Sequence, residues 1–160
     1  MKLTILCIGR LKEDAETAIF GRYLERLAQM GGQYGLGPAT LIELPESRAK
    51  TARERKAGEA AALQKRVPAD AEILVLDERG RTLSSAEFSE KIRNARDGGL
   101  KNLCFVIGGP DGLDPDFVRR ADLAISFGRM TLPHGLVRAV LAEQLYRAAT
   151  IIAGHPYHRE

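Results

Sequence analysis

The sequence predicts an α/β fold with a mainly parallel sheet flanked by helices. The first reason is that short apolar runs alternate with longer segments of helical periodicity. The second is that the runs are apolar almost throughout, as expected for parallel strands covered on both faces. The third is that 160 residues suit one domain, and no repeat or linker divides residues 1–160.

Five apolar runs are the predicted strands. Each is five or six residues long, and the neighbouring residues are rich in glycine, proline and charge, which favour loops and turns. The predicted strands cover residues 3–8, 40–44, 73–77, 103–107 and 123–127.

The segments between these runs are predicted helices, because apolar residues recur there at helical spacing. Two helix starts carry capping signals: Ser84 and Glu87 form a capping box, and Asp114-Pro115 supplies an N-cap and a first helical position. The predicted helices cover residues 18–30, 47–67, 84–97, 115–121 and 136–152.

The last predicted helix is apolar over much of its circumference. A helix of this kind is buried on two sides. We expect one side of helix 136–152 to meet the sheet and the other to meet a second subunit. Glu143 and Arg147, four residues apart, are interpreted as a simple ion pair on this helix.

The chain carries 24 lysines and arginines against 21 aspartates and glutamates, a net charge of +3. This excess permits a nucleic-acid partner but is too small to establish one. The helix around residues 48–66 is strongly charged, and it is interpreted either as a solvated face or as a surface for an RNA backbone. Its charged residues are Arg48, Lys50, Arg53, Glu54, Arg55, Lys56, Glu59, Lys65 and Arg66.

Cysteine and histidine usage argues against several classes of protein. Cys7 and Cys104 lie inside apolar runs, where a cysteine is usually a small buried side chain. No CxxC or HExxH spacing occurs, so we expect no metal site. The N-terminus lacks a secretory cleavage pattern, and no apolar run approaches the roughly 18 residues of a membrane helix. We therefore expect a soluble, cytoplasmic protein.

Ligands of parallel sheets bind beyond the carboxyl ends of the strands, so the loops after Leu76, Ile107 and Phe127 are the candidates. The glycine-rich loop 108–114 matches neither a dinucleotide fingerprint nor a phosphate loop, and it is interpreted as a tight turn or as a ligand-binding loop. The loop 128–134 is unusually apolar for a connection, so we expect it to pack on a ligand, another loop or a second subunit. An adenine ring would suit both loops.

All three histidines lie in the last 27 residues, as His134, His155 and His158. They are close in sequence to Arg138, Tyr157 and Arg159, whose side chains suit stacking on bases and contact with phosphates. A polar site and chance clustering are both open interpretations of this group.

Three motifs in combination resemble one family. They are FVIGGPDGL (105–113), TLPHGLVRAVLAEQLYRA (131–148) and the terminal HPYHRE (155–160). The chain resembles, over its whole length, the small SPOUT-class methyltransferases that modify pseudouridine in large-subunit ribosomal RNA. The resemblance implies a C-terminal trefoil knot, a homodimer, and S-adenosylmethionine held in the knot.

The resemblance also implies which residues contact the methyl donor. Gly128, Arg129, Met130 and Gly135 stand at variable positions of the family pattern, so main-chain contacts are expected there. The implied donor-binding residues are Leu76, Gly108, Gly109, Gly128, Arg129, Met130, Thr131, Leu132 and Pro133.

The acceptor implied by the resemblance is N3 of a pseudouridine in 23S ribosomal RNA, within the assembled ribosome. The residues assigned to it are His134, Arg138, Tyr157, His158 and Arg159, with His158 as the proton acceptor and the two arginines on phosphate or developing charge. The alternatives are a SPOUT methyltransferase acting on tRNA and a non-catalytic ribosome-binding protein. A nicotinamide-dependent oxidoreductase is disfavoured, because the first predicted strand ends without the required glycine spacing.

Overall fold

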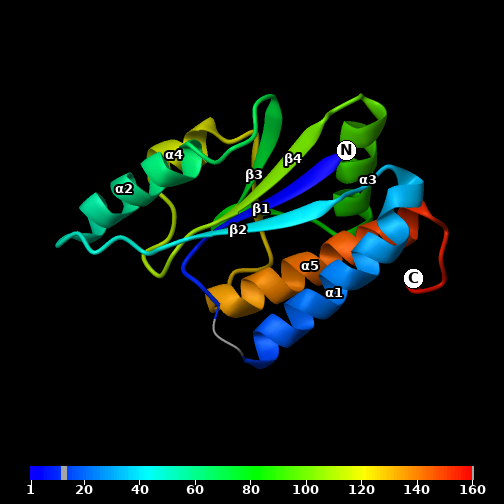
Figure 1. Cartoon of the computed structure of the whole chain (residues 1–160), viewed down its shortest axis with the longest axis horizontal. Coiled ribbons are helices and arrows are strands. Elements are labelled where there is room, and N and C mark those ends of the chain that lie inside the picture. Colours follow the sequence, from blue (N-terminus) through cyan, green and yellow to red (C-terminus); the bar gives the residue numbers. More distant parts are fainter. Residues whose placement is uncertain (12–13, 160) are drawn as a thin grey trace.

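The computed structural model describes residues 1–11 and 14–159. It contains a five-stranded sheet in the order β2-β1-β4-β3-β5, and all neighbouring strands in it run parallel (Figure 1). The α/β class and the parallel sheet are thus confirmed. The strands are β1 (Lys2–Ile8), β2 (Ala39–Leu44), β3 (Ala71–Thr82), β4 (Asn102–Ile107) and β5 (Leu123–Ser126).

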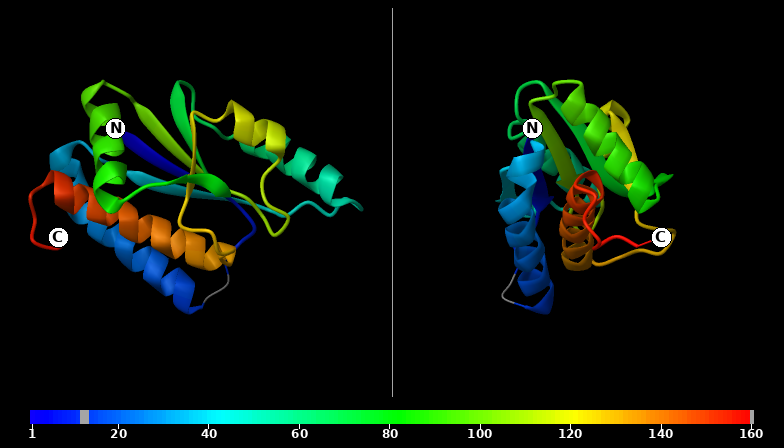
Figure 2. Two further views of the ribbon diagram at one scale, coloured as in Figure 1. Left: turned by 180° about the vertical axis from the view of Figure 1, so that it is seen from behind. Right: turned by 90° about the vertical axis from the view of Figure 1, so that its right-hand side faces the viewer.

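Helices cover both faces of this sheet. A 3-10 turn, η1 (Gly32–Tyr34), follows the first of them. Helices α1, α3 and α5 share one core with the sheet, whereas α2 and α4 belong to a second core on the opposite face (Figure 2). The helices are α1 (Ala15–Gly31), α2 (Ala52–Gln64), α3 (Ser85–Asp97), α4 (Pro115–Arg120) and α5 (His134–Ile152).

The two cores explain the continuous apolar run of β1. Side chains of a strand alternate between the faces of a sheet. Leu3, Ile5 and Cys7 accordingly belong to the core beneath α1, α3 and α5, while Leu6 and Ile8 belong to the core beneath α2 and α4. Both faces need apolar residues, so polar alternation is absent.

Two predicted element boundaries were wrong by five residues, each for a local reason. Helix α2 begins at Ala52 rather than at residue 47, because Thr51 is the N-cap and forms a capping box with Glu54. Strand β3 runs to Thr82 rather than to residue 77, because Arg81 and Thr82 pair with β5 after an interruption. The predicted caps of α3 and α4, Ser84 and Asp114, are confirmed.

Helix α5 is buried on two sides, as predicted, but the second side meets this same chain. It packs between α1 and α3, and Leu141 and Leu145 are almost fully enclosed there. Contact of α5 with a second subunit stays a prediction. The apolar breadth of α5 is explained by contacts within one chain.

Strand β3 makes an unusually close approach to β5. Leu76 and Arg81 both pair with Ile125, so residues 77–80 form a bulge between them. A Cβ atom added to Gly80 would lie 2.6 Å from the carbonyl carbon of Ile125 and 2.7 Å from that of Ala124. Only glycine fits this crossing of two backbones. The trefoil knot implied by the resemblance stays a prediction.

Within the described parts of the chain, no helix is both long enough and apolar enough to span a bilayer.

Candidate functional site

Of the three segments singled out from the sequence, those after Ile107 and Phe127 are loops, whereas the residues after Leu76 form the bulge of β3 rather than the predicted loop. Leu76 pairs in register with Ile107 of β4 on one side and with Ile125 of β5 on the other. Leu76, Ile107 and Ile125 therefore lie at nearly one level of the sheet, although only β4 and β5 end close to this level, because β3 continues through its bulge to Thr82. Leu76 itself is half-buried at this edge. The register brings together the regions to which the sequence assigned donor binding.

The loop after β4 is a tight turn that packs on the protein itself. The N–H of Gly112 donates to the carbonyl of Gly109 at 2.9 Å, and the two residues form an isolated antiparallel bridge. A Cβ atom on Gly108 would lie 2.9 Å from the main chain at Gly112 and Leu113, and one on Gly109 would lie 2.9 Å from Cγ2 of Ile8. Protein packing alone therefore requires both glycines, and donor contact by them stays a prediction.

Helix α2 fixes the position of this loop. Arg55 donates from Nε and Nη2 to the two carboxylate oxygens of Asp111, at 2.6 Å and 3.1 Å. This bidentate pair lowers the pKa of Asp111, chiefly through the hydrogen bond from Arg55. The buried Glu59 accepts the N–H of Ser47 at 2.8 Å, and its other oxygen lies beside the position of a Cβ on Gly109. Arg55 is thus paired within the protein and is not free to bind another molecule.

The side chains of Ser126 and Thr131 anchor the loop after β5, whereas the main-chain groups of residues 129–132 are free within the described part of the chain. The Ser126 hydroxyl accepts the N–H of Gly128 at 3.1 Å and donates to its carbonyl at 2.7 Å. The Thr131 hydroxyl donates to Glu78 of the β3 bulge at 3.0 Å. Across the described residues, the main-chain groups of residues 129–132 have no hydrogen-bond partner. Free main-chain donors and acceptors beside a half-buried leucine fit the edge and face of a nucleoside base.

The C-terminal tail folds back onto α5 and α1. Tyr157 Oη lies 3.1 Å from Glu143 Oε1 and 3.4 Å from Tyr23 Oη. Its ring meets that of Tyr146 edge-on at 4.8 Å, and the Arg147 guanidinium lies 4.8 Å from the ring centre. Of the tail residues, Tyr157 is therefore well anchored. Arg159 is exposed, and the last residue of the HPYHRE motif, Glu160, lies outside the described residues.

Glu143 and Arg147 organise this end of the molecule, a role that the sequence interpretation missed. Arg147 donates from Nε and Nη2 to Glu143 Oε1, at 2.9 Å and 2.6 Å. The same carboxylate oxygen lies within hydrogen-bonding distance of Tyr157, and Arg147 also approaches His158. The two residues make the expected ion pair, but it also anchors the tail. The sequence feature that could have indicated this role is the presence of two charged residues on a largely apolar helix.

The hydrogen bonds of the tail determine whether Tyr157 and His158 can donate or accept a proton. Burial, followed by the contacts with Tyr23 and Glu143, raises the pKa of Tyr157, so its hydroxyl stays protonated at neutral pH and acts as a donor. His158 Nδ1 lies 3.3 Å from Arg147 Nη1. Because an arginine can only donate, Nδ1 accepts in this contact, and a neutral ring then carries its proton on Nε2. His158 must leave Arg147 before Nδ1 can accept a proton from another group.

Arg138 lies away from the tail and is fully buried. Its Nη1 donates to Glu43 at 2.5 Å, and its Nη2 donates to the carbonyls of Ile8 and Gly9 at 2.9 Å and 2.8 Å. The guanidinium therefore joins α5 to the ends of β1 and β2. It presents no surface to an RNA molecule.

The candidate acceptor residues form two separate groups within one chain. His134 begins α5, whereas Tyr157 and His158 pack against Glu143 and Arg147, nine or more residues further along the helix. Nine residues correspond to about 14 Å of helix axis. The five predicted acceptor residues are therefore not brought together in a single chain.

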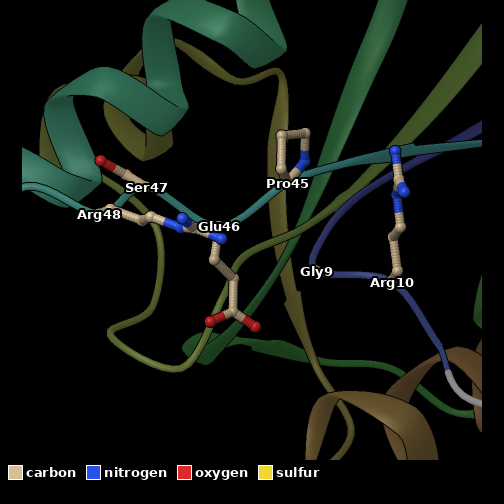
Figure 3. A pocket seen from close by; sticks show the side chains of 6 residues that line it. All are labelled: Gly9, Arg10, Pro45, Glu46, Ser47 and Arg48. Carbon is tan, nitrogen blue, oxygen red and sulfur yellow. The ribbon is translucent and has the colours of Figure 1, made fainter.

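Two surface hollows lie beside α2 or the segment that precedes it. One, of about 440 Å³, is lined by Gly9, Arg10 and the segment 45–48 (Figure 3). The other, of about 520 Å³, lies between α2 and α4. Neither is lined by a residue assigned to the methyl donor. Among the described residues, no group of three or more histidine, cysteine or acidic side chains is arranged to hold a metal ion.

Comparison with known proteins gives a consistent result over the full length. Residues 1–158 match the family model described as predicted SPOUT methyltransferase. A protein of Xanthobacter autotrophicus named Ribosomal RNA large subunit methyltransferase H is 50% identical, over 99% of both chains. Proteins with the same name from Sinorhizobium fredii and Methylorubrum populi are 49% and 50% identical, over 99% of this chain and 99% and 97% of theirs.

Proposed function

The chain belongs to the SPOUT methyltransferase family, and from this premise we propose that it methylates N3 of a pseudouridine in 23S ribosomal RNA, using S-adenosylmethionine. The observation that carries the proposal is the full-length identity of about half with proteins named Ribosomal RNA large subunit methyltransferase H. It is supported by the register of Leu76, Ile107 and Ile125, which brings the β3 bulge and the loops after β4 and β5 to neighbouring positions in the sheet.

The residues at this edge suit the proposed cofactor. S-adenosylmethionine, when bound, supplies a methyl group on a positively charged sulfur that is already activated for transfer. The free main-chain groups of residues 129–132 would hold the adenine edge, and Leu76 would supply an apolar wall. Gly108 and Gly109 would bring the loop after β4 close to the nucleoside, with Gly128 and Pro133 bounding the loop after β5.

The chain's task toward the acceptor is placement and proton removal. As the bond between N3 and the methyl carbon forms, the bond from that carbon to sulfur breaks and the proton on N3 must leave. We assign the proton to His158 Nδ1, which becomes free when substrate binding separates the ring from Arg147. Tyr157 would donate a hydrogen bond to the base and Arg159 would contact phosphate. Arg138 is assigned to positioning, because its guanidinium is fully buried.

A homodimer is part of the proposal. In one chain the loop that ends at Pro133 and the contact of the tail with Glu143 are separated along α5, so a second copy can supply one of the two parts. The large apolar side chains exposed on the described residues, Ile19, Met130 and Leu136, are candidate contacts for that copy.

The test is methyl transfer from labelled S-adenosylmethionine to ribosomes that lack the modification, followed by mass spectrometry of the nucleosides. We expect one methyl group on one pseudouridine of 23S RNA, and much less product on protein-free RNA. Product on tRNA instead, or no binding of S-adenosylmethionine by calorimetry, would refute the proposal. The His158→Ala variant should lose about 10²–10⁴-fold in kcat if His158 is the base. Undiminished turnover would exclude that role.

A further inference from the structure

The net positive charge of the chain is concentrated in one segment. Residues 46–66 contain seven lysines and arginines against three glutamates, so their net charge of +4 exceeds the +3 of the whole chain. Glu59 is buried and Arg55 is paired with Asp111, which leaves the remaining cations to face solvent or the rim of the nearby hollow.

The cations nearest the sheet gather at its carboxyl edge. Arg10 follows the end of β1, and Arg48 and Lys50 lie in the segment that follows β2. Figure 3 shows Arg10 on one side of the 440 Å³ hollow and Arg48 on the other, with Glu46 between them. Arg53 continues this basic row into the first turn of α2. All four cations are exposed, and none forms an ion pair with another described residue.

Hydrogen bonds connect this basic segment (residues 46–66) to the predicted donor loop after β4. The sheet is parallel, so the ends of β1 and β2 lie at the same edge as those of β4, β3 and β5. The Arg55–Asp111 pair joins α2 to the loop after β4, and Glu59 joins Ser47 to the surroundings of Gly109. A polyanion held on the basic segment would therefore be held at a fixed position relative to that loop.

We propose that Arg10, Arg48, Lys50 and Arg53 form a surface that binds the phosphate backbone of the RNA substrate beside the methyl-transfer site. This inference rests on the proposed function and adds the surface by which the RNA is held. Exposed, unpaired cations in a row suit phosphates, which release counterions when they bind. The near-neutral remainder of the chain makes this edge the favoured approach for a polyanion.

The test compares two triple variants with the same change in charge. The first carries Arg48→Glu, Lys50→Glu and Arg53→Glu. The control carries Lys2→Glu, Arg93→Glu and Lys101→Glu, which are exposed positions at the start of β1, on α3 and immediately before β4. The readouts are KM and kcat with unmethylated ribosomes, the affinity for a fluorescein-labelled RNA hairpin as a function of salt, and the affinity for S-adenosylmethionine.

We expect the first variant to raise KM roughly tenfold or more and to reduce the salt slope of hairpin binding by about three, one per cation removed. Affinity for S-adenosylmethionine should be unchanged, and the control variant should stay near wild type. Equal effects in both variants, or a raised KM with unchanged hairpin binding, would overturn the proposal. The latter result would point to a protein partner on the ribosome.

Two further measurements cover a triple variant that does not fold and a wild-type protein that does not methylate ribosomes. Should the triple variant fail to fold by circular dichroism, the neutral single variants Lys50→Ala and Arg53→Ala replace it, each with an expected slope change of about one. A wild-type protein that leaves ribosomes unmethylated refutes the proposed function, while the hairpin measurement still decides whether this surface binds RNA.

Discussion

Arg138 and Glu43 form an ion pair that joins α5 to β2, with 2.5 Å between Nη1 and Oε1. Arg138 also donates to the carbonyls of Ile8 and Gly9, and Glu43 accepts the N–H of Leu11 at 2.8 Å. One buried guanidinium thereby fixes the end of β1, the end of β2 and the first turns of α5. The pair lies directly beneath the hollow at the carboxyl edge, since Gly9 lines that hollow.

Arg138→Met should lower the free energy of unfolding by about 3–5 kcal/mol, because the carboxylate and two buried carbonyls lose their donor. Urea denaturation followed by circular dichroism measures this change. Arg22→Met is the control, since Arg22 is exposed on α1 and should change stability by less than about 0.5 kcal/mol. A similarly small effect at Arg138 would show that the pair contributes little to the fold.

Gly80→Ala should destabilise the protein by about 1–3 kcal/mol or more, because the new Cβ would press on the backbone of β5. Gly21→Ala is the matched change on α1. A Cβ there meets nothing within 4 Å, so alanine should stabilise the helix by about 0.5–1 kcal/mol. Thermal unfolding of both variants gives the comparison. Equal stability of the two would contradict the close crossing of β3 and β5.

Tyr157 should make stability depend on pH in the alkaline range. Its pKa is raised in the folded protein, first by burial, so the unfolded chain releases this proton first, near pH 10. Its contribution is therefore fully present below about pH 10 and is lost as pH rises toward the folded-state pKa. Tyr157→Phe should flatten this alkaline decline and cost about 0.5–1.5 kcal/mol at pH 7.

The pH dependence of urea denaturation tests this expectation. Tyr34→Phe is the control, because the Tyr34 hydroxyl makes no hydrogen bond to any described residue. Its profile should match that of the wild type. A Tyr157→Phe profile identical to both would mean that the tail is not anchored on Glu143 in solution.

The two cysteines should be unreactive in the native protein. Burial raises the pKa of both thiols to about 12, and each side chain is fully enclosed. Ellman's reagent at pH 8 should therefore modify neither Cys7 nor Cys104 until urea unfolds the chain, when two thiols per chain should react. Rapid modification of a native thiol would show that the sheet opens locally.

Several features could be predicted from the sequence because their causes are local. The apolar runs indicated strands covered on both faces, and the capping residues Ser84 and Asp114 marked two helix starts. The loop after Ile107 could be selected because a parallel sheet directs its strand ends to one edge, whereas the bulge that replaces a loop after Leu76 depends on pairing with β5. Motif resemblance then supplied the family, which the full-length match confirms.

Other features depended on contacts between distant residues. Arg138 was assigned to substrate because a guanidinium close in sequence to the histidines suits phosphate or developing charge, and nothing near it in sequence indicates Glu43, 95 residues away. The packing of α5 between α1 and α3 could not be predicted, because periodicity reports burial without naming what covers the helix. The anchoring of Tyr157 on Glu143 required the chain to turn back after α5.

The sequence by itself determined the alternation of strands and helices, the two-sided burial of the sheet and the family, because these follow from local periodicity, caps and motifs. Tertiary structure alone decided the strand order, the enclosure of Arg138, the separation of the acceptor residues and the basic edge beside the donor loop. The physical reason is that each of these depends on which distant segments share a neighbour, and packing of the whole chain fixes that choice.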